Sequence, residues 1–311
     1  MTLAFVFPGQ GSQSVGMQAD IVTAFPQVLE TYAEASDVLG FDVRELIQSG
    51  PEDRLNETIN TQPVMVTAGV AAWRAWKIAG GALPAMMAGH SLGEYSALVC
   101  AGSLAFDDAL RLVRRRAELM QNAVPAGEGA MAAVLGLEDQ AIIEVCKRAS
   151  GTGVVEPVNF NSPGQVVVAG NRAAVEKVME LAKAAGAKRA IMLPVSVPAH
   201  SSLMRPVGDA LAEALSEATF SSPEIPVVNA SNAAAYGGED DIRGQLTRQV
   251  SSPVRWVDVI NYFTRRGVTT VAECGPGKVL TALNRRINRD LATTCIDSPE
   301  AISSLLAGAN G

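Results

Sequence analysis

The segment at residues 89–93, with the sequence Gly-His-Ser-Leu-Gly, constrains the fold more than any other part of the chain, because it matches the G-x-S-x-G pattern of a nucleophile elbow. An apolar run at 83–88 precedes it and is suited to a buried strand. Residues 95–102 have the composition of a small-residue helix that ends at a glycine. The pattern requires a strand, a sharp turn and a helix in this order. Although the chain has 28 glycines, this context makes Ser91 the candidate nucleophile.

The two glycines of the elbow and the residue after the serine have separate expected roles. Gly89 and Gly93 lack a Cβ, so the helix can pass close to the strand and the turn can be sharp. The backbone amide of Leu92 falls at the start of the helix, where it can face an oxyanion that develops on a substrate. The elbow therefore predicts acyl transfer or hydrolysis through an activated serine.

Composition excludes several other classes of protein. Hydrophobic residues make up 48% of the 311 residues and charged residues 18%, so the chain can bury a full core as one large domain or two ordinary ones. A net charge of −7 without a basic stripe argues against nucleic-acid binding. The cysteines are widely spaced and form no CxxC, which predicts neither a zinc site nor a disulfide framework; they are Cys100, Cys146, Cys274 and Cys295.

The sequence also carries an expectation about location. The first residues lack the charged segment of a signal peptide, and their apolar run ends at Pro8. We find no stretch of about 18 apolar residues that could cross a membrane. Reduced cysteines suit the cytosol. We therefore expect a soluble, cytoplasmic protein with no membrane partner.

A second glycine-rich loop follows the first predicted strand. Residues 3–7 form a short apolar run that leads directly into Pro-Gly-Gln-Gly-Ser-Gln at 8–13. A strand that feeds such a loop favours a βα unit with a binding loop at the carboxyl end of the strand. The loop does not match G-x-G-x-x-G, so a dinucleotide site is not supported. A plain connecting turn is the alternative interpretation.

Hydrophobic periodicity divides the rest of the chain into two patterns. We predict helices within 17–50, at 64–78 and at 106–121, and later at 202–218, 242–250 and up to 266; strands at 225–228 and 268–273, the latter the final one; and an exposed loop at 232–241. Between them lies a βαββαβ series, with strands at 129–135, 154–160, 165–169 and 189–195, and helices at 138–149 and 171–185, the second capped by Asn171. This order is ferredoxin-like. It predicts a small domain, residues 126–196, inserted into a larger one formed by 1–125 and 197–311.

A nucleophilic serine needs a base, and the chain has only two histidines. His90 adjoins Ser91 within the elbow, where neighbouring side chains diverge, so His200 is the candidate base. A hydrolase triad would place an acid between the serine and the histidine, but no acid there follows a strand on a loop. We therefore expect a backbone carbonyl to orient the imidazole, as in a Ser–His dyad.

One arginine in the helix at 106–121 is a candidate anion-binding residue. Arg111, Arg114 and Arg115 are interpreted as a solvated helix face. Arg116 is rotated by about 100° from Arg115 around the helix and lies one turn after the apolar Leu112 and Val113. It can therefore point inward. An inward arginine needs an anion, which a substrate carboxylate would supply.

Several motifs then occur together in one order. They are Phe-Pro-Gly-Gln-Gly-Ser-Gln at 7–13, Gly-His-Ser-Leu-Gly-Glu at 89–94, Asn-Phe-Asn-Ser-Pro-Gly-Gln at 159–165, Val-Pro-Ala-His at 197–200 and Gly-Pro-Gly at 275–277. Over essentially its whole length the chain resembles the malonyl-CoA:acyl carrier protein transacylases of bacterial fatty acid synthesis. The resemblance implies an α/β fold, in which an α/β-hydrolase-like large domain with a parallel sheet carries the ferredoxin-like insert.

The resemblance also implies site residues and partners. Ser91 resembles the acyl-accepting nucleophile and His200 its base, and Arg116 resembles the arginine that pairs with the malonyl carboxylate. Further residues match by position: the amides of Gln10 and Leu92 for the oxyanion hole, the backbone carbonyl of Gln249 for orienting the histidine, and Gln62 and Asn161 for lining the pocket. Ala199 departs from the serine more often found there. The implied protein is a monomer without bound cofactor or metal that uses malonyl-CoA as substrate and acyl carrier protein as partner.

Other functions remain open at this stage. One is a serine hydrolase of a small ester or thioester. Others are the transacylase subunit of malonate decarboxylase, a discrete polyketide acyltransferase, and a non-catalytic module that docks a carrier protein. Four basic residues could meet an acidic carrier protein, although a solvated surface is the simpler interpretation; they are Lys188, Arg189, Arg285 and Arg286.

Overall fold

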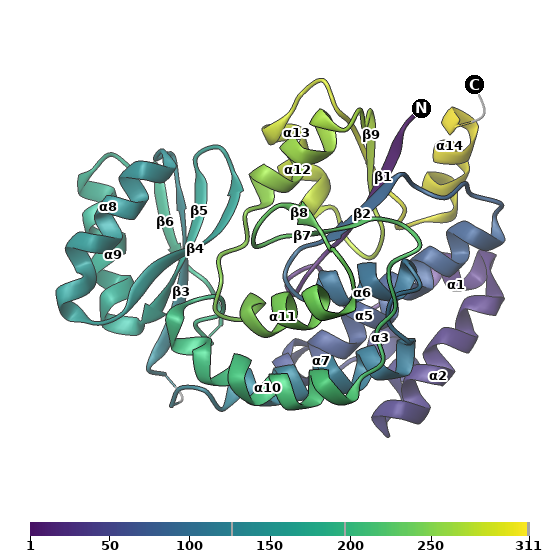
Figure 1. Ribbon diagram of the computed structural model, residues 1–311, viewed down its shortest axis with the longest axis horizontal. Helices are drawn as coiled ribbons and strands as arrows, with labels where there is room; N and C mark the ends of the chain where they lie inside the picture. The colour runs from purple at the N-terminus through teal and green to yellow at the C-terminus, as the bar shows by residue number, and fades with distance from the viewer. Residues whose placement is uncertain (126, 196, 310–311) are drawn as a thin grey trace.

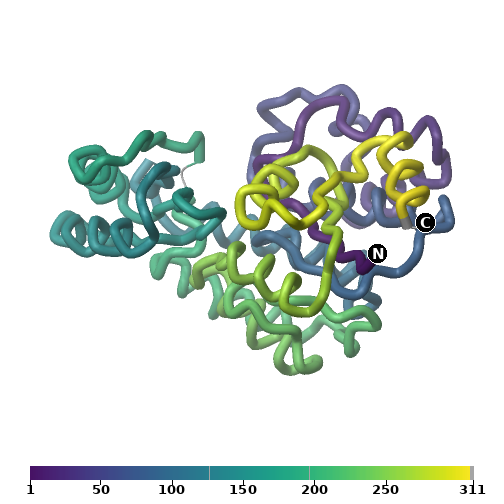
Figure 2. Tube along the Cα trace, turned by 90° about the horizontal axis from the view of Figure 1, so that it is seen from above, coloured from purple at the N-terminus to yellow at the C-terminus, as the bar shows by residue number. Residues whose placement is uncertain are grey.

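The structure, a computed structural model, describes residues 1–125, 127–195 and 197–309, and two β-sheets divide them into two regions (Figure 1). A six-stranded sheet with strand order β10-β9-β1-β2-β7-β8 organises residues 1–125 and 197–309, which we call the six-stranded region. A four-stranded sheet with order β4-β5-β3-β6 organises residues 127–195, the four-stranded region. Seen from above, the four-stranded region stands to one side of the larger one (Figure 2). The predicted domain boundaries at 126 and 196 lie outside the described residues.

The six-stranded sheet is parallel apart from its last pair. Its strands are β1 (Leu3–Phe7), β2 (Met86–Gly89), β7 (Val227–Asn229), β9 (Thr270–Glu273) and β10 (Ala292–Cys295), with β8 (Ala234–Ala235) antiparallel to β7. Every residue of β1 is buried: Phe5 packs edge-on against two tryptophans on one face, while Ala4 and Val6 face the opposite core. Helices cover both faces, which explains why β1 is a continuous apolar run instead of an alternating one.

The six-stranded region contains the predicted helices, with adjusted ends, and three helices that were not predicted, at 52–56, 279–287 and 299–309. Together they are α1 (Ala19–Ala24), α2 (Leu29–Leu39), α3 (Val43–Ser49), α4 (Glu52–Asn56), α5 (Thr58–Ile78), α6 (Gly93–Cys100), α7 (Phe106–Gln121), α10 (Arg205–Glu217), α11 (Glu239–Gln249), α12 (Trp256–Arg265), α13 (Val279–Ile287) and α14 (Pro299–Ala309). The predicted start of α5 at residue 64 was wrong, because Pro63 lies inside the helix. Burial of nearly the whole helix offsets the backbone hydrogen bond that this proline cannot donate.

The four-stranded sheet is antiparallel throughout. It contains β3 (Gly129–Leu135), β4 (Val155–Ser162), β5 (Gln165–Asn171) and β6 (Arg189–Met192), with α8 (Asp139–Ala149) and α9 (Arg172–Ala184) packed on one face. Along β3, Ala130, Ala132 and Val134 face these helices, and Met131 faces the other side, as the two-residue period of a strand requires. Asn171 precedes α9 as predicted, but its side chain accepts a hydrogen bond from the amide of Val154 and does not cap the helix.

Three further expectations were wrong in detail. Strand β2 begins at Met86 and not at residue 83. Residues 83–85 precede the segment that pairs with β1, and Leu83 is 66% exposed. The strand at 270–273 is not the last, since β10 follows it and pairs with it. The segment 232–241 is not simply an exposed loop, because it contains β8 and the buried hydroxyl of Tyr236.

The two regions are joined beside the site. The amide of Val254 donates to the carbonyl of Val158 at 2.8 Å, and the amide of Phe160 donates to the carbonyl of Val254 at 2.9 Å. Strand β4 is thereby fixed to the segment that precedes α12. The pocket described next is lined by residues from both regions.

Candidate active site

The elbow has the strained geometry that its sequence predicts. Ser91 follows β2 with a φ of 54°, in the left-handed region that non-glycine residues seldom adopt. A Cβ on Gly89 would lie 1.9 Å from the carbonyl carbon of Gly93, and a Cβ on Gly93 would lie 2.2 Å from the carbonyl oxygen of Phe7. Only glycine fits at either position, so α6 packs against β1 and β2 and the serine stands at the tip of the turn.

Ser91 and His200 meet although 109 residues separate them in the chain. The Oγ of Ser91 lies 2.7 Å from Nε2 of His200. The other ring nitrogen, Nδ1, lies 2.9 Å from the carbonyl oxygen of Gln249 and 3.0 Å from that of Ser252. Since carbonyl oxygens only accept, Nδ1 carries the proton and Nε2 is left to accept the proton of Ser91. Among the described residues, no carboxylate contacts this histidine.

The environment keeps His200 neutral. Its side chain is buried, with 4% of the residue exposed. Burial, followed by the positive charge of Arg116, lowers the pKa of His200 to about 3. An imidazole with such a pKa is unprotonated near neutral pH and is therefore in the form that a general base needs.

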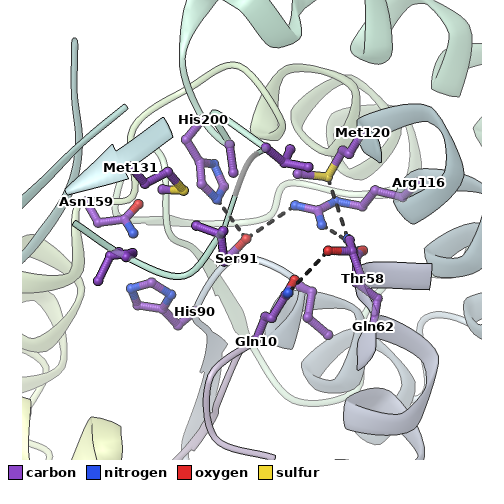
Figure 3. A pocket seen from close by; sticks show the side chains of 15 residues that line it. Gln10, Thr58, Gln62, His90, Ser91, Arg116, Met120, Met131, Asn159 and His200 are labelled. Atoms are coloured by element: carbon purple, nitrogen blue, oxygen red, sulfur yellow. Dashed lines mark hydrogen bonds between the residues drawn. The ribbon is translucent and has the colours of Figure 1, made fainter. Parts of the chain in front are cut away.

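Arg116 points inward from α7, and its guanidinium reaches the nucleophile (Figure 3). One terminal nitrogen donates to Oε1 of Gln62 at 2.8 Å; the other lies 3.3 Å from Oγ of Ser91 and 3.1 Å from Oε1 of Gln249. Among the described residues, its buried Nε has no hydrogen-bond partner. Arg111, Arg114 and Arg115 lie on the outer face, with 40–59% of their side chains exposed.

The charge of Arg116 is not neutralised by a direct ion pair. Only 1% of the residue is exposed, and burial lowers its pKa. In the part of the chain that the structure describes, no carboxylate lies within 4 Å of its guanidinium. A buried cation held only by neutral oxygens is stabilised by an anion that enters the site.

The two predicted oxyanion donors border the same pocket. Gln10 follows β1, and its side-chain amide donates to Oγ1 of Thr58 at 3.3 Å. Leu92 follows the serine directly, at the amino end of α6. Within the described residues, the backbone amides of Gln10 and Leu92 donate to no other protein group. Both are therefore free to bind a substrate oxygen.

The four-stranded region closes the pocket with a largely apolar wall. The residues that line the pocket from this side are Met131, Asn159, Leu193 and Val195, joined by Met120, Val197 and Ala199 from the other region. Asn159 is the polar exception, and its buried Oδ1 has no hydrogen-bond partner in the described part of the chain. The predicted lining residue Asn161 is not among the residues that line the pocket; its Oδ1 lies 2.9 Å from Nε2 of His90, which does line it.

The structure, over its described residues, contains no group of three or more histidine, cysteine or acidic side chains placed to bind a metal ion. The four cysteines are buried thiols without disulfide partners. In the same residues, no helix is long and apolar enough to cross a membrane.

Known proteins are similar to this chain over nearly its whole length. A family model described as "Acyl transferase domain" matches residues 4–296. The malonyl CoA-acyl carrier protein transacylase of Escherichia coli strain K12 is 53% identical over 303 residues, which cover 97% of this chain and 98% of that protein. The chain belongs to the acyl transferase family.

Solved structures of other acyl transferases superpose on this acyl transferase closely. The crystal structure of acyl-carrier-protein S-malonyltransferase from Burkholderia pseudomallei 1710b is 54% identical, with a TM-score of 0.97 over 99% of this chain and 100% of that one. A malonyl-transacylase solved in complex with a type II polyketide acyl-carrier protein is 50% identical, with a TM-score of 0.98 over 99% and 100% of the two chains.

Sequence reasoning missed part of the site of this acyl transferase. The signal for Asn159 was its place in the motif at 159–165, not strand alternation with Asn161, because the pairing of β4 is irregular between Phe160 and Ser162. Met120 carries a comparable signal, since it follows Arg116 by four residues on α7. Nothing in the sequence indicated the side-chain role of Gln249 or the burial of Glu94, because their contacts join distant segments.

Proposed function

We propose that this acyl transferase moves a malonyl group from malonyl-CoA, through an ester on Ser91, to the phosphopantetheine thiol of acyl carrier protein. The observation that carries the proposal is the buried guanidinium of Arg116, which lies 3.3 Å from the oxygen of Ser91 and has no carboxylate partner among the described residues. A malonyl thioester ends in a carboxylate, which supplies the missing anion while its carbonyl carbon lies at the serine. The names of the relatives support this substrate and this partner.

The first half-reaction forms the malonyl ester. Oγ of Ser91 attacks the thioester carbonyl carbon and passes its proton to Nε2 of His200. The amides of Gln10 and Leu92 bind the resulting oxyanion. The carbon–sulfur bond then breaks, and the departing sulfur of CoA takes the proton from Nε2.

The second half-reaction reverses these steps with a new thiol. After CoA leaves, the phosphopantetheine sulfur enters the same pocket and gives its proton to His200 while it attacks the ester. The oxyanion forms and collapses again, the carbon–oxygen bond to Ser91 breaks, and the serine regains its proton. In both half-reactions the backbone carbonyls of Gln249 and Ser252 accept hydrogen bonds from Nδ1 of His200 and so orient its ring. No carboxylate is needed for this role.

We assign the two regions to the predicted domain types. The six-stranded region is α/β-hydrolase-like: its parallel strands carry the glycine-rich loop and the elbow at their carboxyl ends. The four-stranded region is a ferredoxin-like insert, which the order β3-α8-β4-β5-α9-β6 supports. The protein acts as a cytoplasmic monomer and needs no bound cofactor.

The decisive experiment is the mass of the intact protein after mixing with malonyl-CoA in the absence of an acceptor. We expect one malonyl adduct, its absence in Ser91→Ala, and its discharge by holo-acyl carrier protein. Unmodified protein with accumulation of free CoA and malonate would instead identify a hydrolase. No adduct and no release of CoA would refute the choice of malonyl as the acyl group.

The same assay can test which type of acyl carrier protein is preferred, since one relative is bound to a polyketide carrier protein. Discharge rates with a fatty-acid and with a polyketide acyl carrier protein, measured side by side, identify the preferred partner.

A further inference from the structure

A buried carboxylate behind the elbow takes no part in the steps above. Glu94 lies in the first turn of α6, three residues after Ser91, and none of its surface is exposed. Removing a carboxylate from water is costly unless hydrogen bonds replace the lost solvation. Its Oε1 accepts from Nδ2 of Asn229 at 2.7 Å and from the hydroxyl of Tyr236, and its Oε2 accepts from Nε2 of Gln249 at 2.6 Å. All three partners are donors.

Gln249 connects this carboxylate to three parts of the site. Its Nε2 donates also to the backbone carbonyl of Ser91 at 2.9 Å. Its Oε1 accepts from Arg116 at 3.1 Å, and its own backbone carbonyl faces Nδ1 of His200. The side chain of Gln249 is 1% exposed, so water does not substitute for these contacts.

The orientation of the Gln249 amide is fixed by its neighbours. An amide has one donor end and one acceptor end. The donor end faces Glu94 and the carbonyl of Ser91, which accept. The acceptor end faces the guanidinium of Arg116, which only donates. A reversed amide would place donors against Arg116 and acceptors against Glu94, so the carboxylate determines which end the arginine meets.

We propose that Glu94 is a positioning residue that acts through the Gln249 amide to hold Arg116 beside Ser91, and so sets the preference for acyl groups that end in a carboxylate. The inference rests on the proposed malonyl transfer. Gln249 and Gln62 hold the two terminal nitrogens of Arg116 from different sides, which leaves the guanidinium directed at the nucleophile. Glu94 itself touches neither the substrate pocket nor His200.

The substitution Glu94→Gln separates this role from simple packing. The new amide must turn its oxygen to Asn229 and Tyr236, which donate, and its nitrogen then faces the nitrogen of Gln249. Gln249 has to turn away or reverse, and either change withdraws the oxygen that Arg116 uses. The Ser91–His200 pair does not depend on that oxygen, so transfer of a neutral acyl group should continue.

The experiment compares kcat/KM for malonyl-CoA and acetyl-CoA in the whole protein, with holo-acyl carrier protein as acceptor. An assay at about pH 8 keeps Glu94 ionised, because burial raises its pKa to about 7. We expect Glu94→Gln to lower the malonyl value about tenfold or more, with the acetyl value changed by less than about threefold. The matched control is Tyr236→Phe, which removes another donor to Glu94 but leaves the Gln249 contact, and should keep the malonyl-to-acetyl ratio within about twofold.

A second variant tests the proposal even if Glu94→Gln does not fold. Gln249→Met keeps the backbone carbonyl for His200 but removes both ends of the amide, and it should lower the malonyl-to-acetyl ratio as far as Glu94→Gln does. Combining the two substitutions should lower it no further, because Glu94 acts only through Gln249. A normal ratio in Gln249→Met, or equal losses for malonyl and acetyl in Glu94→Gln, would overturn the proposal. A wild-type protein that forms no malonyl ester would instead refute the proposed function.

Discussion

The six-stranded and four-stranded regions meet at one pocket but bring different kinds of side chain to it. The six-stranded region contributes Ser91, His200 and Arg116, all held by hydrogen bonds to buried groups. The four-stranded region contributes a mainly apolar wall that includes Met131. Groups that exchange protons or bind charge must be placed within a fraction of an ångström. A wall that excludes water needs only shape.

The two sheets explain this division of labour. In the parallel sheet both faces are covered, and the carboxyl ends of β1 and β2 bring the glycine-rich loop and the elbow together. In the antiparallel sheet one face is covered by α8 and α9, which leaves the face of Met131 for the pocket. Substitutions in the first region should therefore abolish or redirect the chemistry, and those in the second should tune the size of the acyl group.

The largest effect is expected for the base. His200→Ala should slow formation of the malonyl ester by about 1,000-fold or more, because Ser91 then has no group to accept its proton. Rapid-quench mass spectrometry measures the rate. His90→Gln serves as the comparison, since His90 contacts Asn161 and not the serine oxygen. Equal losses in the two variants would show that the six-stranded region does not rely on His200 in particular.

Arg116→Ala comes next and tests charge selection in the same region. The malonyl value of kcat/KM should fall by about 100-fold, because a buried carboxylate loses its charged partner. The acetyl value should change far less. The control is Arg115→Ala, because the side chain of Arg115 lies on the outer helix face and is 52% exposed. If malonyl and acetyl transfer decline together, Arg116 does not bind the substrate carboxylate.

A smaller effect is expected from the four-stranded region. Met131→Ala should lower malonyl transfer by less than about tenfold and improve the use of a branched or longer acyl-CoA. The smaller side chain enlarges the pocket without changing the Ser91–His200 pair. Ile191→Ala is the control, since Ile191 is exposed on β6. Steady-state kinetics with malonyl-CoA and the larger acyl-CoA measure the effect. A loss of malonyl transfer as large as that of Arg116→Ala would contradict the proposed difference between the two regions.

The smallest effect is expected from a change of pH, which should not alter the protonation of His200 between pH 8 and 5. The His200 pKa of about 3 lies below its ordinary value, so lowering the pH from 8 to 5 leaves the imidazole neutral and able to act as base. Proton NMR of its ring should show no titration over this range, whereas an exposed histidine would titrate near 6.5. A midpoint above pH 5 would mean that the six-stranded region does not exclude water from its base.

Local patterns were enough to predict much of the fold. Strands β1 and β3 and helix α7 have the predicted bounds, because their apolar residues follow the period of each element and glycine, proline or charged residues mark the ends. The period of α7 also allowed Arg116 to point inward, and the structure shows that this residue is buried. The start of α5 was missed because the helix was predicted to begin only after Pro63. The last strand, β10, was missed because its hydrophobic alternation is weak.

What the sequence by itself determined is the set of reactive groups: a serine on a sharp turn between two glycines, one available histidine and one arginine that can point inward. These follow from neighbouring residues, since turn geometry and helix period act over a few positions. Only the tertiary structure decided how the groups are held. The Gln249 amide meets Glu94 across 155 positions and Arg116 across 133, and such contacts form only when the parallel sheet brings those segments into one core.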